Sequence, residues 1–203
     1  WCLSQIHQPD SEEARTEARK RLVFEEFFYL QVALALKRGE SLQELGIEFQ
    51  MDEPSLWSSI HKMLPFELTG AQRRVIGEIW SDMKMQAPMN RLVQGDVGSG
   101  KTAVAACAIL AAVQDGYQTV MMAPTEILAE QHYANLKKLF EPLGIEVVQL
   151  VGKLTAAQKK RAYDLTASGK AQVAVGTHAL IQEGVSFANL GLAVIDEQHR
   201  FGV

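Results

Sequence analysis

The stretch GDVGSGKT, residues 95–102, has the residue types and the spacing that hold a phosphate chain. It matches G-x-x-x-x-G-K-[ST] and stands between a short apolar run and an apolar helical stretch. Such a loop points backbone N–H groups inward, and a helix beginning near Lys101 adds its positive dipole end. We expect the Lys101 ammonium to reach the β- and γ-phosphates of ATP and the Thr102 hydroxyl to bind Mg²⁺. The residues expected to contact the nucleotide here are Gly95, Asp96, Val97, Gly98, Ser99, Gly100, Lys101 and Thr102.

Two adjacent acids end the last apolar run, LAVIDEQH, residues 192–199. Asp196 is expected to hold Mg²⁺ through its water shell, and Glu197 to orient or deprotonate the attacking water. Taken alone, the run is equally well a strand that ends in a solvated acidic turn. Together with the phosphate loop, the two acids favour hydrolysis over transfer to a small substrate.

The stretch LPFELTGAQ, residues 64–72, precedes the phosphate loop and contains two further nucleotide candidates, Phe66 and Gln72. A glutamine amide can pair with both N6 and N7 of adenine, so Gln72 is a candidate base reader. From spacing alone, an exposed residue in a first helical turn is the simpler interpretation of Gln72.

Five short apolar runs alternate with helical stretches through the second part of the chain. Continuous apolar strands separated by helices indicate a parallel sheet covered on both faces, with ligands bound beyond the carboxyl ends of the strands. The expected strands are RLVQ, TVMMA, EVVQLV, AQVAVG and LAVID; the expected helices are 101–114, 126–140, 156–168 and a short one at 178–182.

The first part of the chain is expected to be helical. A helix over 11–38 is capped by Ser11 and ended by Gly39, with an apolar stripe of Val23, Phe27, Leu30 and Leu34 that packs against more than one surface. A short helix follows Pro54 and stops at Pro65, with Leu56 and Ile60 facing inward, and another runs from a Thr69 cap through Met85, with Val75, Ile76, Ile79 and Met83 buried. We place the boundary between a helical linker segment, 1–64, and an α/β domain, 65–203, near Leu64.

Composition narrows the function classes. The chain of 203 residues is 47% hydrophobic and 22% charged, which is ordinary for a globular protein with a real core, and no apolar run approaches a membrane span. The two cysteines form neither a disulfide framework nor a metal knuckle, so we expect a cytoplasmic location and no metal held by side chains alone. The net charge of −4 lacks the basic footprint of a stand-alone nucleic-acid binder.

With these pieces placed, the chain resembles the first motor domain of superfamily 2 helicases, and most closely the RecG-type ATP-dependent DNA helicases. The matching motifs are LTGAQ (68–72), GDVGSGKT (95–102), APTEILAEQH (123–132), VGTHALIQ (175–182) and IDEQHRFGV (195–203). The alternative, the transcription-repair coupling type of DNA translocase, typically has Phe where Ser99 stands and DEEH where this chain has DEQH. The resemblance implies a RecA-like P-loop NTPase fold behind a helical linker, with ATP and Mg²⁺ as cofactors.

The resemblance also implies roles for single residues. It favours Gln72 as the adenine reader after all. It places nucleic-acid backbone contacts at Pro124, Thr125, Gly176 and Thr177, with Gly152 and Lys153 as weaker candidates. Backbone N–H groups and hydroxyls just past strand ends can bind phosphates without a basic surface. Helix capping is the other interpretation of Thr125 and Thr177, and His132 and His178 are expected to pack or hydrogen-bond rather than catalyse.

The family's substrate is branched DNA, such as stalled forks and Holliday junctions. The resemblance further implies that a second motor lobe, with an arginine for the γ-phosphate, and a DNA wedge domain lie outside residues 1–203. Two hypotheses of other classes remain: a non-motor P-loop kinase or nucleotide switch, and a binding module whose ATPase is vestigial. The first lacks an N/T-K-x-D base-reading segment and a visible acceptor site.

Overall fold

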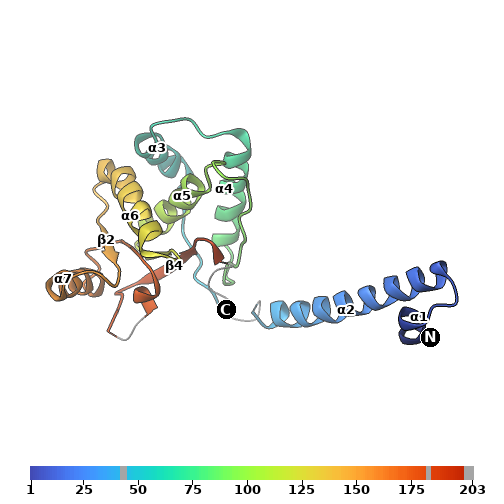
Figure 1. The fold of residues 1–203 in the computed structure, drawn as a ribbon. Helices are drawn as coiled ribbons and strands as arrows, with labels where there is room; N and C mark the ends of the chain where they lie inside the picture. The colour runs from blue at the N-terminus through green and yellow to red at the C-terminus, as the bar shows by residue number, and fades with distance from the viewer. Residues whose placement is uncertain (42–44, 182–183, 199–203) are drawn as a thin grey trace. The chain divides into compact units, whose positions relative to one another are not determined.

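The computed structural model describes residues 1–41, 45–181 and 184–198. The chain divides into two compact units, Trp1–Gly46 and Ile47–Val203 (Figure 1). Residues 47–64 thus belong to the second unit. The boundary near Leu64 was drawn from motifs rather than from packing, and it stays a prediction.

The first unit is a helical hairpin of α1 (Cys2–His7) and α2 (Glu12–Ser41). The Ser11 hydroxyl accepts a hydrogen bond from the backbone N–H of Ala14 at 3.1 Å, which confirms the predicted cap. The helix does not end at Gly39 but continues to Ser41. A single glycine costs a helix only about 1 kcal/mol, which does not by itself stop it.

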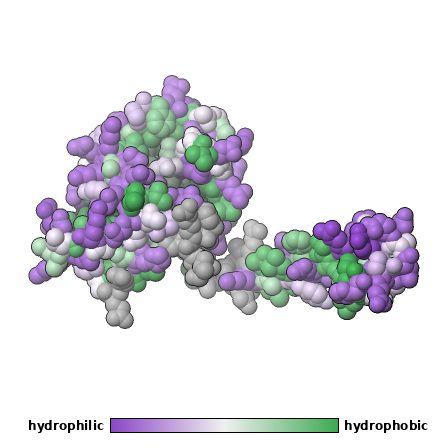
Figure 2. All heavy atoms as spheres, in the orientation of Figure 1, coloured by the Kyte–Doolittle hydropathy of each residue, from purple (hydrophilic) through white to green (hydrophobic). Residues whose placement is uncertain are grey.

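Within this unit α2 buries little. Ala18 is fully buried, and α1 packs against α2, but the expected apolar stripe is exposed. Figure 2 shows apolar side chains gathered over α2. The residues of this unit that the structure describes leave the stripe uncovered. The exposed stripe residues are Val23, Phe27, Leu30 and Leu34, with Phe24 and Phe28 beside them.

The second unit is built on a parallel four-stranded sheet in the order β2-β3-β1-β4. Its strands are β1 (Gln118–Met122), β2 (Val147–Leu150), β3 (Val173–Gly176) and β4 (Leu190–Ile195). Four of the five predicted strands are therefore confirmed. The fifth, RLVQ, is wrong: residues 91–94 pair with no strand among the described residues. An apolar run has strand propensity, but a strand also needs a ladder partner, which sequence cannot supply.

Helices cover both faces of this sheet. On one face Met121, Val173 and Val175 join a core with α5 (Lys101–Gln114) and α6 (Glu126–Phe140). On the other, Val120 and Ala174 pack with α7 (Ala156–Ala167) and the 3₁₀ helix η2 (His178–Ile181). The alternation of neighbouring strand residues between the two cores follows the period of two in a strand. A further short 3₁₀ helix, η1, spans Glu141–Leu143.

Two more helices extend the first core, and both were predicted. In α3 (Glu53–Met63), Leu56 and Ile60 are buried. In α4 (Gly70–Met83), Ile76, Ile79 and Met83 are buried, whereas Val75 is only partly so. None of the helices in the described ranges is both long and apolar enough to cross a membrane.

Candidate functional site

The phosphate loop is an irregular, exposed segment between residue 94 and the start of α5. Gly98 and Gly100 have φ angles of 82° and 83°, in the left-handed region that favours glycine. The backbone N–H of Ser99 donates to the Asp96 carbonyl at 3.1 Å, and Val97 at the tip is fully exposed. Gly100 is the N-cap of α5 and supplies no capping side chain, so the first turn presents its N–H groups to the loop.

Lys101 is folded back onto this loop. Its ammonium donates to the Gly95 carbonyl at 2.7 Å and to the Asp96 carbonyl at 2.9 Å. An ammonium has three N–H donors, so these two contacts leave one for a phosphate, and further contact with a phosphate chain requires exchange of a loop carbonyl. The loop is therefore closed on itself by the same cation that was predicted to bind phosphate.

Gln72 ties α4 to the loop. Its Nε2 donates to the Ser99 carbonyl at 2.9 Å, and its Oε1 accepts from the Thr69 N–H at 2.8 Å. The Thr69 hydroxyl in turn accepts from the Gln72 N–H, which completes a capping box. One of the two N–H donors and one of the two acceptor positions of the amide are thus engaged within the protein, and pairing with adenine must share or replace these contacts. Phe66, the other base candidate, is 53% exposed beside a small hollow lined by Trp57 and Arg73.

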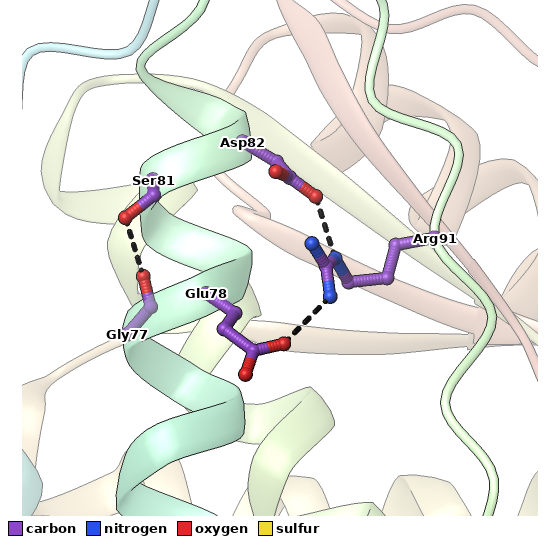
Figure 3. A network of polar contacts seen from close by, with 5 residues as sticks. All are labelled: Gly77, Glu78, Ser81, Asp82 and Arg91. Atoms are coloured by element: carbon purple, nitrogen blue, oxygen red, sulfur yellow. Dashed lines mark hydrogen bonds and ion pairs between the residues drawn. The ribbon is translucent and has the colours of Figure 1, made fainter.

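Arg91 stands at the start of the segment 91–94 that leads into the loop, and its side chain attaches this segment to α4 (Figure 3). Its Nε donates to Asp82 at 2.5 Å and its Nη1 to Glu78 at 2.9 Å, both on α4. The hydrogen bond to Asp82, with the charges of Asp82 and Glu78, raises the pKa of Arg91. Sequence reasoning missed this contact because RLVQ was interpreted as a strand. Side chains of α4 thus secure the segment where a sheet does not.

The carboxyl ends of the four strands lie in register at one edge of the sheet. Met122 stands beside Gly176 and Ile195, and Gly176 stands beside Leu150. Hydrogen bonds continue one residue past the strands, from the Ala123 N–H to the Gly176 carbonyl and from the Asp196 N–H to the Met122 carbonyl, both at 2.9 Å. The structure therefore brings the predicted motifs at 123–125, 151–153, 176–177 and 196 to one edge.

The predicted nucleic-acid residues at this edge have structural partners of their own. The Thr125 hydroxyl caps α6 by accepting from the Leu128 N–H at 3.3 Å, and Pro124 directly precedes this cap. The Thr177 N–H donates to the Leu150 carbonyl at 3.4 Å, next to Gly176. The Thr125 hydroxyl accepts in the cap and can still donate its proton to a phosphate. The Thr177 N–H is engaged with the Leu150 carbonyl, so its hydroxyl is the candidate donor to a phosphate.

The two weaker candidates lie against acidic side chains of α6. Lys153 forms an ion pair with Glu130. A side chain on Gly152 would come within 2.6 Å of a carboxylate oxygen of Glu126. Lys153 is 58% exposed, so its ammonium can leave Glu130 for a phosphate at small cost.

The acidic pair follows β4. Asp196 accepts a hydrogen bond from Nε2 of His132, on α6, at 2.7 Å. This confirms that His132 is a hydrogen-bonding residue, and it names a partner that sequence spacing could not. Glu197 has a φ of 52°, the one non-glycine residue of the described ranges in the left-handed region. The last part of the predicted motif IDEQHRFGV, residues 199–203, lies outside the described residues.

The oxygen atoms offered at this site fit a hard divalent cation that completes its coordination shell with water and substrate oxygens. The described residues contain no group of three or more histidine, cysteine or acidic side chains able to enclose a metal. Asp196, directly after β4, and Thr102, in the first turn of α5, instead offer single oxygens, and β4 and α5 pack together. Mg²⁺ suits such a site because it takes one or two protein oxygens and fills its octahedron with water and substrate phosphates.

Comparison with known proteins identifies the class. A family model described as DEAD/DEAH box helicase matches residues 69–203. The chain therefore belongs to the DEAD/DEAH box helicase family.

Particular relatives match along the whole chain. The ATP-dependent DNA helicase RecG of Synechocystis sp. is 50% identical over 202 residues, covering 100% of this chain and 24% of that relative. RecG of Bacillus subtilis is 48% identical over 203 residues, covering 100% of this chain and 30% of the relative. The RecG-type resemblance seen in the motifs is thereby confirmed, and the coupling translocase is not favoured.

Comparison with solved structures supports the same resemblance. The structure of RecG bound to a three-way DNA junction matches with a TM-score of 0.86 at 46% identity, covering 98% of this chain and 27% of that one. A hypothetical ATP-dependent RNA helicase from Sulfolobus tokodaii matches with a TM-score of 0.53 at 21% identity, covering 73% and 42%, which shows the fold alone. The RecA-like parallel fold is confirmed, and the chain spans about a quarter of the RecG relatives.

Proposed function

We propose that the chain is the first motor lobe of an ATP-dependent DNA helicase that remodels branched DNA. The observation that carries the proposal is the in-register edge of the sheet, where Asp196 and the starts of two predicted backbone-binding motifs share one ladder. That edge offers hydrolysis and polynucleotide contact in a single rigid frame. The RecG relatives are named as DNA helicases, and one is solved on a three-way junction.

In this proposal the phosphate loop binds the nucleotide, and Lys101 exchanges its loop carbonyls for the β- and γ-phosphates. Thr102 and Asp196 would hold Mg²⁺, which neutralises charge that develops on the phosphates. Glu197 orients the attacking water and takes its proton. Gln72 reads adenine after release of the Ser99 carbonyl.

The nucleic-acid backbone binds along the strand ends. The Thr125 hydroxyl before α6 and the Thr177 hydroxyl after β3 can donate to phosphates without reading sequence. Pro124, which has no N–H, and Gly176, the last residue of β3, would let the main chain pass close to the phosphates. Lys153 and its neighbour Gly152 add a flanking contact. We place this activity in the cytoplasm, with the DNA.

The remaining parts of the motor belong to the rest of the protein. A second lobe would supply the arginine that stabilises the γ-phosphate, and such an arginine contributes about 10³–10⁵ in rate. A wedge domain would engage the branch. We therefore expect residues 1–203 alone to bind Mg-ATP weakly and not to unwind forks.

The test is ATP hydrolysis by a protein of the relatives' full length that carries these residues, measured with and without fork DNA. We expect fork DNA to stimulate hydrolysis. Lys101→Ala should abolish turnover because it removes the cation on the phosphate chain, whereas Lys138→Ala, an exposed lysine at the end of α6, should not. Equal rates with and without fork DNA would contradict the proposed function, and normal turnover by Lys101→Ala would remove that lysine from the mechanism.

A further inference from the structure

His132 is a buried histidine that the proposed mechanism does not use. It lies on α6 with 8% of its surface exposed, and its Nε2 stands 2.7 Å from Oδ2 of Asp196. An ionised carboxylate only accepts hydrogen bonds, so Nε2 carries the proton. The imidazole is therefore a donor aimed at the acid that is expected to hold the metal.

The other nitrogen of the ring is unusual. His132 Nδ1 is buried and has no hydrogen-bond partner among the described residues. An unsatisfied buried polar atom destabilises the folded state, and an apolar side chain of similar volume would avoid that cost. Packing alone therefore does not account for a histidine here, whereas its bond to Asp196 does.

Two groups from the segment that runs from the end of β1 into α6 hold Asp196. Its backbone N–H donates to the Met122 carbonyl at the end of β1, and its side chain is held by His132 on the helix that follows β1. With Oδ2 engaged, Oδ1 is the oxygen without a hydrogen-bond partner in the described ranges. The geometry selects one orientation of the carboxylate.

The same helix reaches the proposed nucleic-acid contact. Thr125 caps α6 at its N-terminus, and His132 follows seven residues later, two turns along and on the same face. A phosphate bound at Thr125 would therefore lie at the N-terminus of the helix that carries the donor to Asp196.

We propose that His132 is a positioning residue, which orients Asp196 for Mg-nucleotide and through which α6 links polynucleotide binding to the acid. The inference rests on the proposed function for the identity of the two ligands. It concerns a side chain outside the nucleotide-binding and acidic motifs, one that touches neither ligand.

The first test needs no turnover. A fluorescent, non-hydrolysable ATP analogue is bound to the full-length protein in EDTA, and its affinity is then followed as MgCl₂ is added. Loss of a hydrogen-bonding partner of a metal-binding carboxylate costs about 10–100-fold in metal affinity. His132→Leu should raise the half-saturating Mg²⁺ concentration about tenfold. His132→Gln, whose amide N–H₂ reaches the place of Nε2, should recover most of it.

His7→Leu serves as the matched control, because His7 is an exposed histidine of the first unit. Its Mg²⁺ dependence should equal that of the wild type. A wild-type Mg²⁺ dependence in His132→Leu overturns the proposal, as does a Gln variant no better than the Leu variant.

A second readout keeps the proposal testable if His132→Leu fails to fold. In histidine-labelled wild-type protein, the imidazole spectrum should report a proton on Nε2 of His132, and Mg-nucleotide should shift this signal but not that of His7. A proton on Nδ1, or an unmoved signal, overturns the proposal.

The link to polynucleotide is tested by hydrolysis. Fork DNA should stimulate His132→Leu several-fold less than wild type, with His132→Gln restoring stimulation. Equal stimulation overturns the link. Absence of stimulation in the wild type counts instead against the proposed function, while the Mg²⁺ titration still judges His132.

Discussion

The phosphate loop and the strand-end edge, the two halves of the proposed site, are held in different ways. The edge is fixed by backbone hydrogen bonds that run from β2 through β3 and β1 to Asp196. The loop is exposed, pairs with no strand of the described ranges, and is held by the side chains of Gln72, Arg91 and Lys101. Backbone ladders have one stable arrangement, whereas side-chain contacts can be exchanged for those of a ligand. We infer that the proposed acid and backbone contacts are preformed and that the loop rearranges when nucleotide binds.

The largest effect should come from the rigid half. A Cβ on Gly176 would lie 2.0 Å from the Leu150 carbonyl oxygen, inside the ladder between β3 and β2. Gly176→Ala must push the strands apart, and we expect a loss of about 2–3 kcal/mol in the free energy of unfolding, measured by chemical denaturation.

The matched control is Gly77→Ala in α4, where an added Cβ meets nothing within 4 Å. This change should stabilise by about 0.5–1 kcal/mol, because alanine is the better helix former. A Gly176→Ala variant as stable as wild type would show that the edge is not rigid.

The pH dependence of stability that Cys107 causes tests whether α5, the helix that follows the loop, is rigid. Cys107 is fully buried in α5, and burial raises the pKa of its thiol to about 12, from 9.0. Between these values the unfolded chain releases a proton that the folded chain keeps. Stability should therefore fall by about 1.4 kcal/mol per pH unit above pH 9.

The measurement is the difference in unfolding free energy between wild type and Cys107→Ala from pH 8 to 11. The slope of wild type should exceed that of the variant. In addition, Cys107 should resist a thiol reagent in the folded protein, with and without nucleotide, while the partly exposed Cys2 reacts. If Cys107 became reactive when nucleotide binds, the part of the chain that rearranges would extend beyond Gly100 into α5.

The smallest effect on stability belongs to the loop. The ion pairs of Arg91 are partly exposed, so Arg91→Ala should cost less than about 1 kcal/mol. Nucleotide affinity should nevertheless fall, since the segment before the loop loses its anchor on α4. Fluorescence titration compares this variant with Arg74→Ala, which removes an exposed arginine of the same helix. Equal nucleotide affinities in the two variants would show that Arg91 does not support the loop.

The comparison also explains what the sequence could predict. The helices after Thr125 and Thr155 and the four strands carry local signals, and their bounds were predicted within a few residues. The RLVQ run carries the same kind of signal, but strand formation depends on a distant partner. The contacts of Arg91 with α4 and of His132 with Asp196 join residues 9 to 64 positions apart. No local pattern encodes such pairs.

The exposed stripe of α2 is a second case in which a local pattern predicts an element but not its partner. Its period of apolar residues predicted a helix, and the helix is present. Periodicity names a face that can be buried but not the surface that buries it. In its own unit that face remains exposed.

The central claim is that the loop rearranges on a preformed edge, and amide hydrogen exchange with and without a Mg-bound ATP analogue tests it most directly. We predict fast exchange at residues 95–101 in the free protein and strong protection when nucleotide binds. Exchange at 119–122 and 173–176 should be slow in both states. Strand-end amides that exchange as fast as the loop, or become protected only with nucleotide, would contradict the account.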